Sequence, residues 1–192
     1  MDTLDKLGRT DGGGKLRYQV FLSSGMFTPP PELVAAGGQC WAKLKGGGGG
    51  GSYSNAGSTG YGGAEAWEVV EAATVLVPTA VTIGAGGTPG ASSDGTAGGN
   101  GQDSSFAGNV AKGGGGGRFG LPARLGAQIP IGADGAGMLA GRVDVQPGGA
   151  PPVAGTSAQA NSGAGGAGGS GGNAGSNGTS GGSGKVLIWW YV

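Results

Sequence analysis

Histidine is missing from this 192-residue chain, and cysteine occurs only once, at Cys40. The absence of histidine removes the side chain that most often serves as a general base and as a metal ligand. A single cysteine cannot form an intrachain disulfide. We therefore expect no catalytic residues, no metal site and no bound cofactor, and we do not expect an enzyme.

Charge is scarce and balanced, with 11 basic and 11 acidic residues and a net charge of zero. Such a chain has no field that would attract nucleic acid or an anionic membrane. No apolar run approaches the roughly 20 residues needed to cross a bilayer. The segment Met1–Asp5 lacks the basic and apolar regions of a signal peptide. We expect a protein that is made in the cytoplasm without a secretory signal and that does not bind nucleic acid.

Glycine is abundant, at 52 residues, and one tract is periodic. From Gly163 to Gly184 every third residue is glycine, and partial versions of this series occur at Gly57–Gly63 and Gly95–Gly101. A period of three matches polyproline II geometry, which has about 3.1 Å of rise per residue and no internal hydrogen bonds. Glycine at every third position leaves one face bare, so that another chain can approach and bond. The tract contains no proline, which disfavours a collagen triple helix.

The length of this tract is a second constraint. Residues 163–184 would span about 70 Å if straight, whereas a globular domain of this size has a diameter of roughly 40 Å. We therefore expect the tract to fold back on itself, at Asn173 or Asn177, or to project from the body.

Between the glycine tracts lie islands of β-forming residues. We predict strands at 18–22, 26–27, 39–45, within 64–77, and at 79–83, 105–110, 139–145 and 185–192. In 39–45 apolar and polar residues alternate, and 185–192 is so apolar that we expect a central, buried strand. In 64–77, Glu65, Glu68 and Glu71 are spaced as on a helix, but the β-branched residues favour strand and place the glutamates on a solvated face.

The predicted fold class is mainly β, a small antiparallel β-sandwich with glycine-rich loops packed as polyglycine II-like segments. Aromatic residues within the glycine tracts are the candidate binding residues, because they offer contact area at low entropic cost. They are Tyr53, Tyr61 and Phe119, with Arg118 beside the last. The alternative is that these side chains pack back onto the glycine segments.

The order of several motifs resembles the glycine-rich domains of bacteriophage tail-fibre and tail-tip proteins. Residues 21–29, FLSSGMFTP, are similar to the family's F-x-S-S-G-T-F-T-x-P opening, and 81–87, VTIGAGG, match its V-T-I-G-A-G-G element. The strand 40–45 runs into the polyglycine 46–51, as in the family. Ser104–Phe106 and Ala111–Gly115 match a later S-S-F … A-x-G-G-G-G element, and one hydrophobic strand ends the chain.

The resemblance covers residues 18–192 and implies a receptor-binding virion protein. It implies a homo-oligomer, with a trimer favoured, located in the virion tail and made in the host cytoplasm. Partners would be other tail or baseplate proteins and a host surface molecule, either a glycan or an outer-membrane protein. Residues 1–17 would form an arm that docks onto the virion. Two alternatives remain open: an antifreeze-like polyglycine II protein and a glycine-repeat surface protein of the mycobacterial kind.

Overall fold

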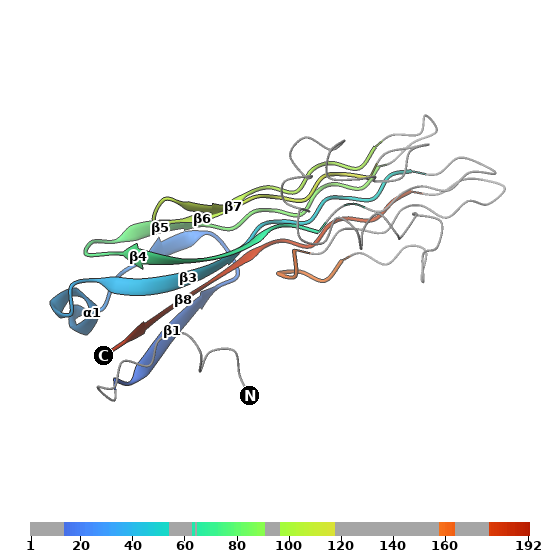
Figure 1. Ribbon diagram of the computed structural model, residues 1–192. Coiled ribbons are helices and arrows are strands. Elements are labelled where there is room, and N and C mark those ends of the chain that lie inside the picture. The colour runs from blue at the N-terminus through green and yellow to red at the C-terminus, as the bar shows by residue number, and fades with distance from the viewer. Residues whose placement is uncertain (1–13, 54–62, 64, 91–96, 118–157, 164–176) are drawn as a thin grey trace.

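The computed structural model describes residues 14–53, 63, 65–90, 97–117, 158–163 and 177–192. These residues form a mainly β protein with two small antiparallel sheets and one short helix (Figure 1). The first strand begins at Leu16, two residues before the predicted domain boundary. The predicted strand at 139–145 lies outside the described residues.

The first sheet has the order β1-β8-β3-β4. Its strands are β1 (Leu16–Phe21), β3 (Gln39–Lys45), β4 (Glu68–Thr74) and β8 (Lys185–Tyr191). The prediction of a central terminal strand is confirmed, since β8 pairs with both β1 and β3. The alternation predicted for 39–45 is also confirmed, because Cys40, Ala42 and Leu44 are buried while their neighbours are not.

The second sheet has the order β2-β5-β6-β7. Its strands are β2 (Gly25–Phe27), β5 (Thr79–Thr82), β6 (Ser104–Phe106) and β7 (Asn109–Ala111). The single strand predicted at 105–110 is wrong, because β6 and β7 form a hairpin there. The turn uses Ala107 and Gly108, which both have positive φ, as tight hairpin turns require.

The helix α1 (Pro31–Ala35) follows the three prolines. Proline suits the first turn of a helix, because its fixed φ is helical and its missing N–H is not needed there. Leu33 is fully buried by this turn. This helix was not predicted from the sequence.

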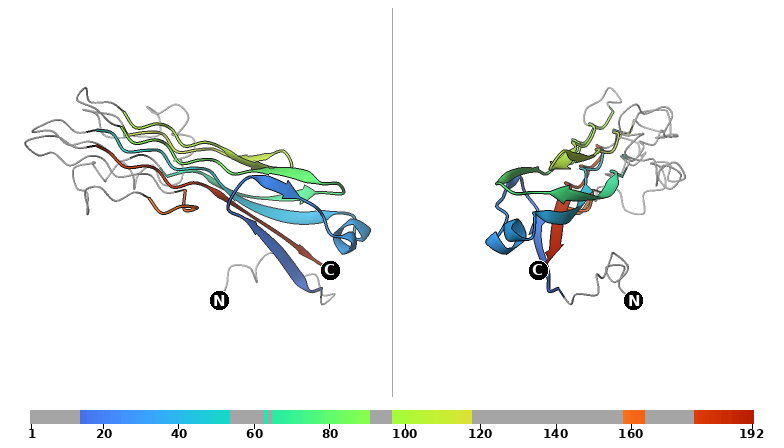
Figure 2. Two further views of the ribbon diagram at one scale, coloured as in Figure 1. Left: turned by 180° about the vertical axis from the view of Figure 1, so that it is seen from behind. Right: turned by 60° about the vertical axis from the view of Figure 1, so that its left-hand side comes forward.

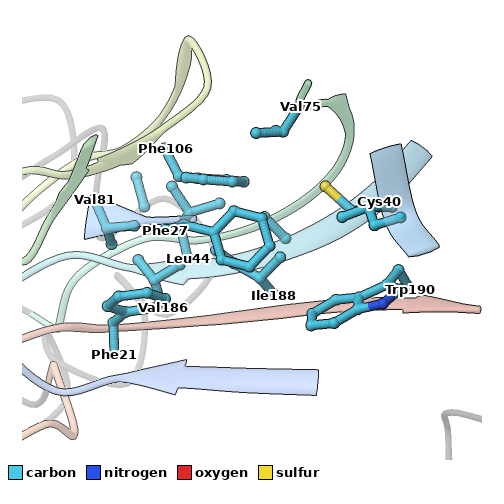
Figure 3. Packing of buried hydrophobic residues seen from close by; sticks show 13 residues of the cluster. Phe21, Phe27, Cys40, Leu44, Val75, Val81, Phe106, Val186, Ile188 and Trp190 are labelled. Atoms are coloured by element: carbon cyan, nitrogen blue, oxygen red, sulfur yellow. The ribbon is translucent and has the colours of Figure 1, made fainter. Parts of the chain in front are cut away.

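The core lies between the two sheets and consists of apolar side chains from both (Figure 3). Phe27 of β2 is fully buried and has three aromatic neighbours. Its ring centroid lies 5.7 Å from those of Phe106 and Trp190 and 6.5 Å from that of Phe21, all in edge-to-face arrangements. Such pairs stabilise a core beyond the area they bury. Phe27 therefore joins the two sheets.

Candidate functional site: a bundle of glycine segments

Glycine-rich segments leave one end of the sandwich as direct continuations of its strands (Figure 1). We call the following set the glycine bundle: residues 46–53, 63 with 65–67, 84–90, 97–102, 113–117 and 177–184. They run side by side away from the sheets, on the side opposite α1, in both the front and the rear view (Figure 2). The sheets therefore set the direction and spacing of the segments.

The polyglycine 46–51 lies at the centre of the glycine bundle. Its amides and carbonyls bond to four other segments with a repeat of three residues. Gly47 and Gly50 donate to the 97–102 segment and accept from the 113–117 segment, whereas Gly48 and Gly51 donate to the 177–184 segment and accept from the 84–90 segment. The donor–acceptor distances are 2.7–2.9 Å. Two faces of this segment thus find partners at a spacing of three residues, and on the third face Gly46 donates to Trp67.

The same repeat joins the outer segments to one another. Gly178, Gly181 and Gly184 donate to the carbonyl oxygens of Gly90, Gly87 and Gly84, at 2.8–3.0 Å. Segments without internal hydrogen bonds satisfy their backbone groups in this way. Polyglycine II-like geometry remains our prediction for the dihedral angles of these segments.

The every-third-residue series has a steric explanation where it is described. A Cβ atom at Gly178, Gly181 or Gly184 would overlap the backbone carbonyl of Gly51, Gly48 or Lys45, respectively. A Cβ atom at Gly98 or Gly101 would likewise overlap the carbonyl of Gly50 or Gly47, respectively. One at Gly63 would overlap the carbonyl of Gly49. The positions Gly57, Gly60, Gly95 and Gly166–Gly175 lie outside the described residues.

Uninterrupted glycine occurs where a segment is covered on all sides. All residues of 46–51 and of 113–117 are buried. In the 84–90 segment, by contrast, Gly84, Gly87 and Gly90 are buried while Ala85 and Thr88 are exposed. Glycine is therefore required at every residue where all faces of a segment contact neighbours, and only at every third residue where one face does.

The two ends of the periodic tract lie close together. A Cβ atom at Gly163 would touch the carbonyl oxygen of Gly46, and one at Gly184 would touch the carbonyl carbon of the same residue. Whether the tract folds back or projects between these ends remains a prediction, because residues 164–176 lie outside the described residues. Asn173 lies outside the described residues, and Asn177 begins the extended segment that leads into β8.

Two polar side chains accept hydrogen bonds from backbone N–H groups of the 113–117 segment. The side-chain oxygens of Asn100 and Asp103 accept the N–H groups of Gly116 and Gly113, each at 2.9 Å. These acceptors are again three residues apart. Sequence reasoning did not single them out for this role, although polar residues at a spacing of three beside a glycine run were the available signal.

The environment of Asp103 affects its ionisation. Burial alone would raise its pKa, but hydrogen bonds from Lys112 and the Gly113 amide, together with the Lys112 charge, outweigh burial and lower the pKa below its usual value of 3.8. The Lys112 Nζ lies 2.8 Å from the carboxylate. The ionised form of Asp103 is thus the one that suits the folded bundle.

The three glutamates do not share a solvated face, so that prediction is wrong. Glu68 forms an ion pair of 2.8 Å with Lys43, and Glu65, which precedes β4, pairs with Lys45. Glu71 lies opposite Ala42, on the other face of the sheet from Glu68. Because side chains alternate along a strand, a spacing of three places two residues on opposite faces.

Of the predicted receptor contacts, only Tyr53 is among the described residues. Tyr53 is half-buried and follows the central polyglycine and Ser52. Tyr61, Arg118 and Phe119 lie outside the described residues. Gly117, which precedes Arg118 in the chain, donates to Gly50. At the end of the bundle farthest from the sheets, described segments finish at Tyr53, Gly90 and Gly117, and others begin at Ala97 and Asn177. We call this end the bundle tip.

The described part of the bundle tip is polar and uncharged. No Asp, Glu, Lys or Arg occurs in 46–53, 84–90, 97–102, 113–117 or 177–184. The side chains it offers include those of Tyr53, Thr88, Asn100 and Asn177. Hydroxyl and amide groups both donate and accept hydrogen bonds, which suits an uncharged polar ligand.

Other chemistry is limited in the part of the chain that the structure describes. There, no group of three or more metal-ligating residues comes together. Cys40 is buried in β3, and burial raises the pKa of its thiol to about 11, so it remains an unreactive thiol at neutral pH. No described helix has the length and apolar character needed to span a membrane.

Comparison of the chain with protein-family models and with curated proteins finds no match. The functional argument therefore rests on the residues and their arrangement.

Proposed function

We propose that this protein is a structural component of a bacteriophage virion, at or near the tail tip or tail fibre, and that it mediates attachment to the host surface. The observation that carries the proposal is that glycine segments from both sheets run side by side, joined by backbone hydrogen bonds, to a shared bundle tip on the side away from α1. Loops on a rigid support can vary in sequence without disturbing the fold. Support also comes from the ordered motifs that resemble tail-fibre and tail-tip domains.

The proposed partners follow from the two ends of the molecule. The bundle tip would contact a glycan or an outer-membrane protein, with Tyr53, Tyr61, Arg118 and Phe119 as candidate contacts. Other tail or baseplate proteins would hold the opposite end. The resemblance also implies a homo-oligomer, with a trimer favoured.

Adsorption competition tests the attachment role. Excess purified protein should slow attachment of phage particles that contain it, because it occupies the host receptor. A variant with Tyr61, Arg118 and Phe119 all replaced by alanine should lose this competition and remain folded. A matched control with Val34→Ala, on the exposed side of α1, should compete like the original protein. If excess protein leaves adsorption unchanged, the receptor-binding role is wrong.

Two further measurements address the alternatives. Antibodies against the protein should label the tail in purified particles, and labelling of neither tail nor capsid would contradict a virion role. An antifreeze-like protein should instead produce thermal hysteresis in solution. We expect none, since polyglycine II proteins of the antifreeze kind usually carry disulfides and lack a sheet, whereas this chain has one cysteine and two sheets.

A further inference from the structure

β1 is one of the two edge strands of the first sheet in the described part of the chain. Lys15 and Val192 exchange two hydrogen bonds, with N–H donors to carbonyl oxygens at 2.6 and 3.2 Å. In an antiparallel ladder the bonded pairs alternate, so Arg17 and Gln19 also bond to β8. The backbone groups of Leu16, Tyr18 and Val20 therefore point away from β8. Among the described residues, no strand pairs with β1 on that side.

The same three residues expose apolar side chains. Leu16, Tyr18 and Val20 are 38%, 68% and 48% exposed. They lie on the face of the first sheet that points away from the second sheet, opposite Tyr191, Trp189 and Leu187 of β8. A solvated sheet face normally carries polar side chains, so this concentration of apolar and aromatic residues indicates a contact surface.

Natural proteins protect open edges with short strands, prolines, bulges or charged side chains. β1 has six residues and no proline, and its one charged residue, Arg17, does not share the face with Tyr18. Only beyond the strand is the edge covered. There the side-chain amide of Asn161, with its nitrogen toward Leu22, donates to the Leu22 carbonyl oxygen at 3.0 Å. As far as the described residues extend, the edge is thus closed at residue 22 and open from 16 to 20.

We infer that the β1 edge pairs with the β1 edge of a second copy of this chain, antiparallel about a two-fold axis at Tyr18. The spacing of the open groups supports this occupant. Residues 16, 18 and 20 are symmetric about 18, so Tyr18 would bond to its own counterpart and Leu16 to Val20 of the other copy. A two-fold interface requires this kind of self-complementary patch.

Charge and shape agree with self-pairing. In this register Arg17 lies opposite Gln19 of the second copy and Lys15 opposite Phe21, so no like charges meet across the strands. On the exposed face, two tyrosines meet at the centre, and leucine meets valine on each side. The inference does not depend on the proposed function, and the trimer implied by the resemblance would be a different assembly.

The first test is the mass of the full-length protein in solution, by analytical ultracentrifugation over a range of concentrations. We expect a concentration-dependent dimer. Tyr18→Lys should weaken dimerisation at least tenfold, because it places two ammonium groups opposite each other at the axis. The control Val70→Lys adds the same charge to the same face of the sheet, on β4, and should change dimerisation less than twofold. A monomer at all concentrations or a trimer would overturn the inference.

The second test fixes the register. In the proposed pair the two Tyr18 Cα atoms would be about 5.5 Å apart, within disulfide range. Under mild oxidation Tyr18→Cys should form a covalent dimer, whereas Leu16→Cys should not, since the two copies of residue 16 would be about 14 Å apart. Buried Cys40 should not interfere. Equal cross-linking of both variants would indicate random collision and contradict the pairing.

Discussion

The sandwich and the glycine bundle are stable for opposite reasons. The sandwich is held by large apolar side chains from both sheets, such as Phe27, Phe106 and Trp190. The bundle has almost no side chains in its interior, and its segments are joined by backbone hydrogen bonds that repeat every third residue. The first region is therefore sensitive to the removal of side-chain atoms, and the second to their addition. We therefore expect truncations to be costly in the sandwich and enlargements to be costly in the bundle interior.

The largest effect should come from emptying the core of the sandwich. Phe27→Ala removes a fully buried ring with three aromatic neighbours and should lower the free energy of unfolding by about 4 kcal/mol. Equilibrium denaturation measures this loss. The matched truncation in the bundle is Thr88→Ala, at an exposed position, and it should cost less than about 0.5 kcal/mol. Similar losses for the two variants would break the comparison.

Adding one methyl group to the bundle interior should have the next largest effect. The Cβ atom of Gly87→Ala would overlap the carbonyl oxygen of Gly99 and the amide nitrogen of Gly50. Overpacking of this kind costs about 1–3 kcal/mol. Ala85→Val, two residues away and exposed, enlarges a side chain without such a clash and should be close to neutral.

Amide hydrogen exchange separates the two regions in these variants. Gly87→Ala should accelerate exchange at Gly50 and Gly99, because opening of the bundle exposes their N–H groups. Exchange in β3 and β8 should change less. Equal acceleration throughout the chain would mean that sandwich and bundle unfold as one unit.

A smaller effect is expected where a side chain completes the bundle. Asn100→Ala leaves the N–H of Gly116 without its acceptor and should cost about 1 kcal/mol. Gln102→Ala is the control, since this exposed residue lies in the same segment and bonds to the bundle through its backbone. A denaturation midpoint for Asn100→Ala equal to that of the control would contradict the proposed role.

The smallest expected effect is a change in stability at acidic pH, and it depends on the ionisation of Asp103. The folded-state pKa of Asp103 lies below its usual value of 3.8, so its carboxylate stabilises the fold above that pH, and this contribution is lost as the pH falls through the folded-state pKa. Asp103→Asn should therefore be slightly less stable than the original protein at pH 7. Below about pH 4 the difference should shrink. Parallel stability curves for the two proteins between pH 2 and 7 would contradict this assignment.

Much of this architecture could be predicted from the sequence because it depends on local patterns. Alternation identified β3, and the density of apolar residues identified β8 as a central strand. The three-residue series predicted close approach at Gly178, Gly181 and Gly184. Each of these signals is carried by residues that are neighbours in the chain.

Features that depend on tertiary partners were not predictable. Asn100 and Asp103 acquire their role only because Gly116 and Gly113 lie beside them. The glutamates at 65 and 68 depend on lysines of β3. The β6–β7 hairpin was missed although its signal is local, at the Ala107–Gly108 turn where both residues have positive φ. The predicted receptor contacts Tyr61, Arg118 and Phe119 fall outside the described residues and remain predictions.

The central position of 46–51 has a consequence for how the molecule is made. Gly48 and Gly51 donate to Gly182 and Thr179, which leave the ribosome after every other described segment of the bundle. Contacts so distant in sequence form slowly, because the loop between them must close first. The bundle can therefore be completed only after residues 177–184 have been translated. Until then, water must hydrate the amides of Gly48 and Gly51, even where Gly47 and Gly50 have already bonded to the 97–102 and 113–117 segments.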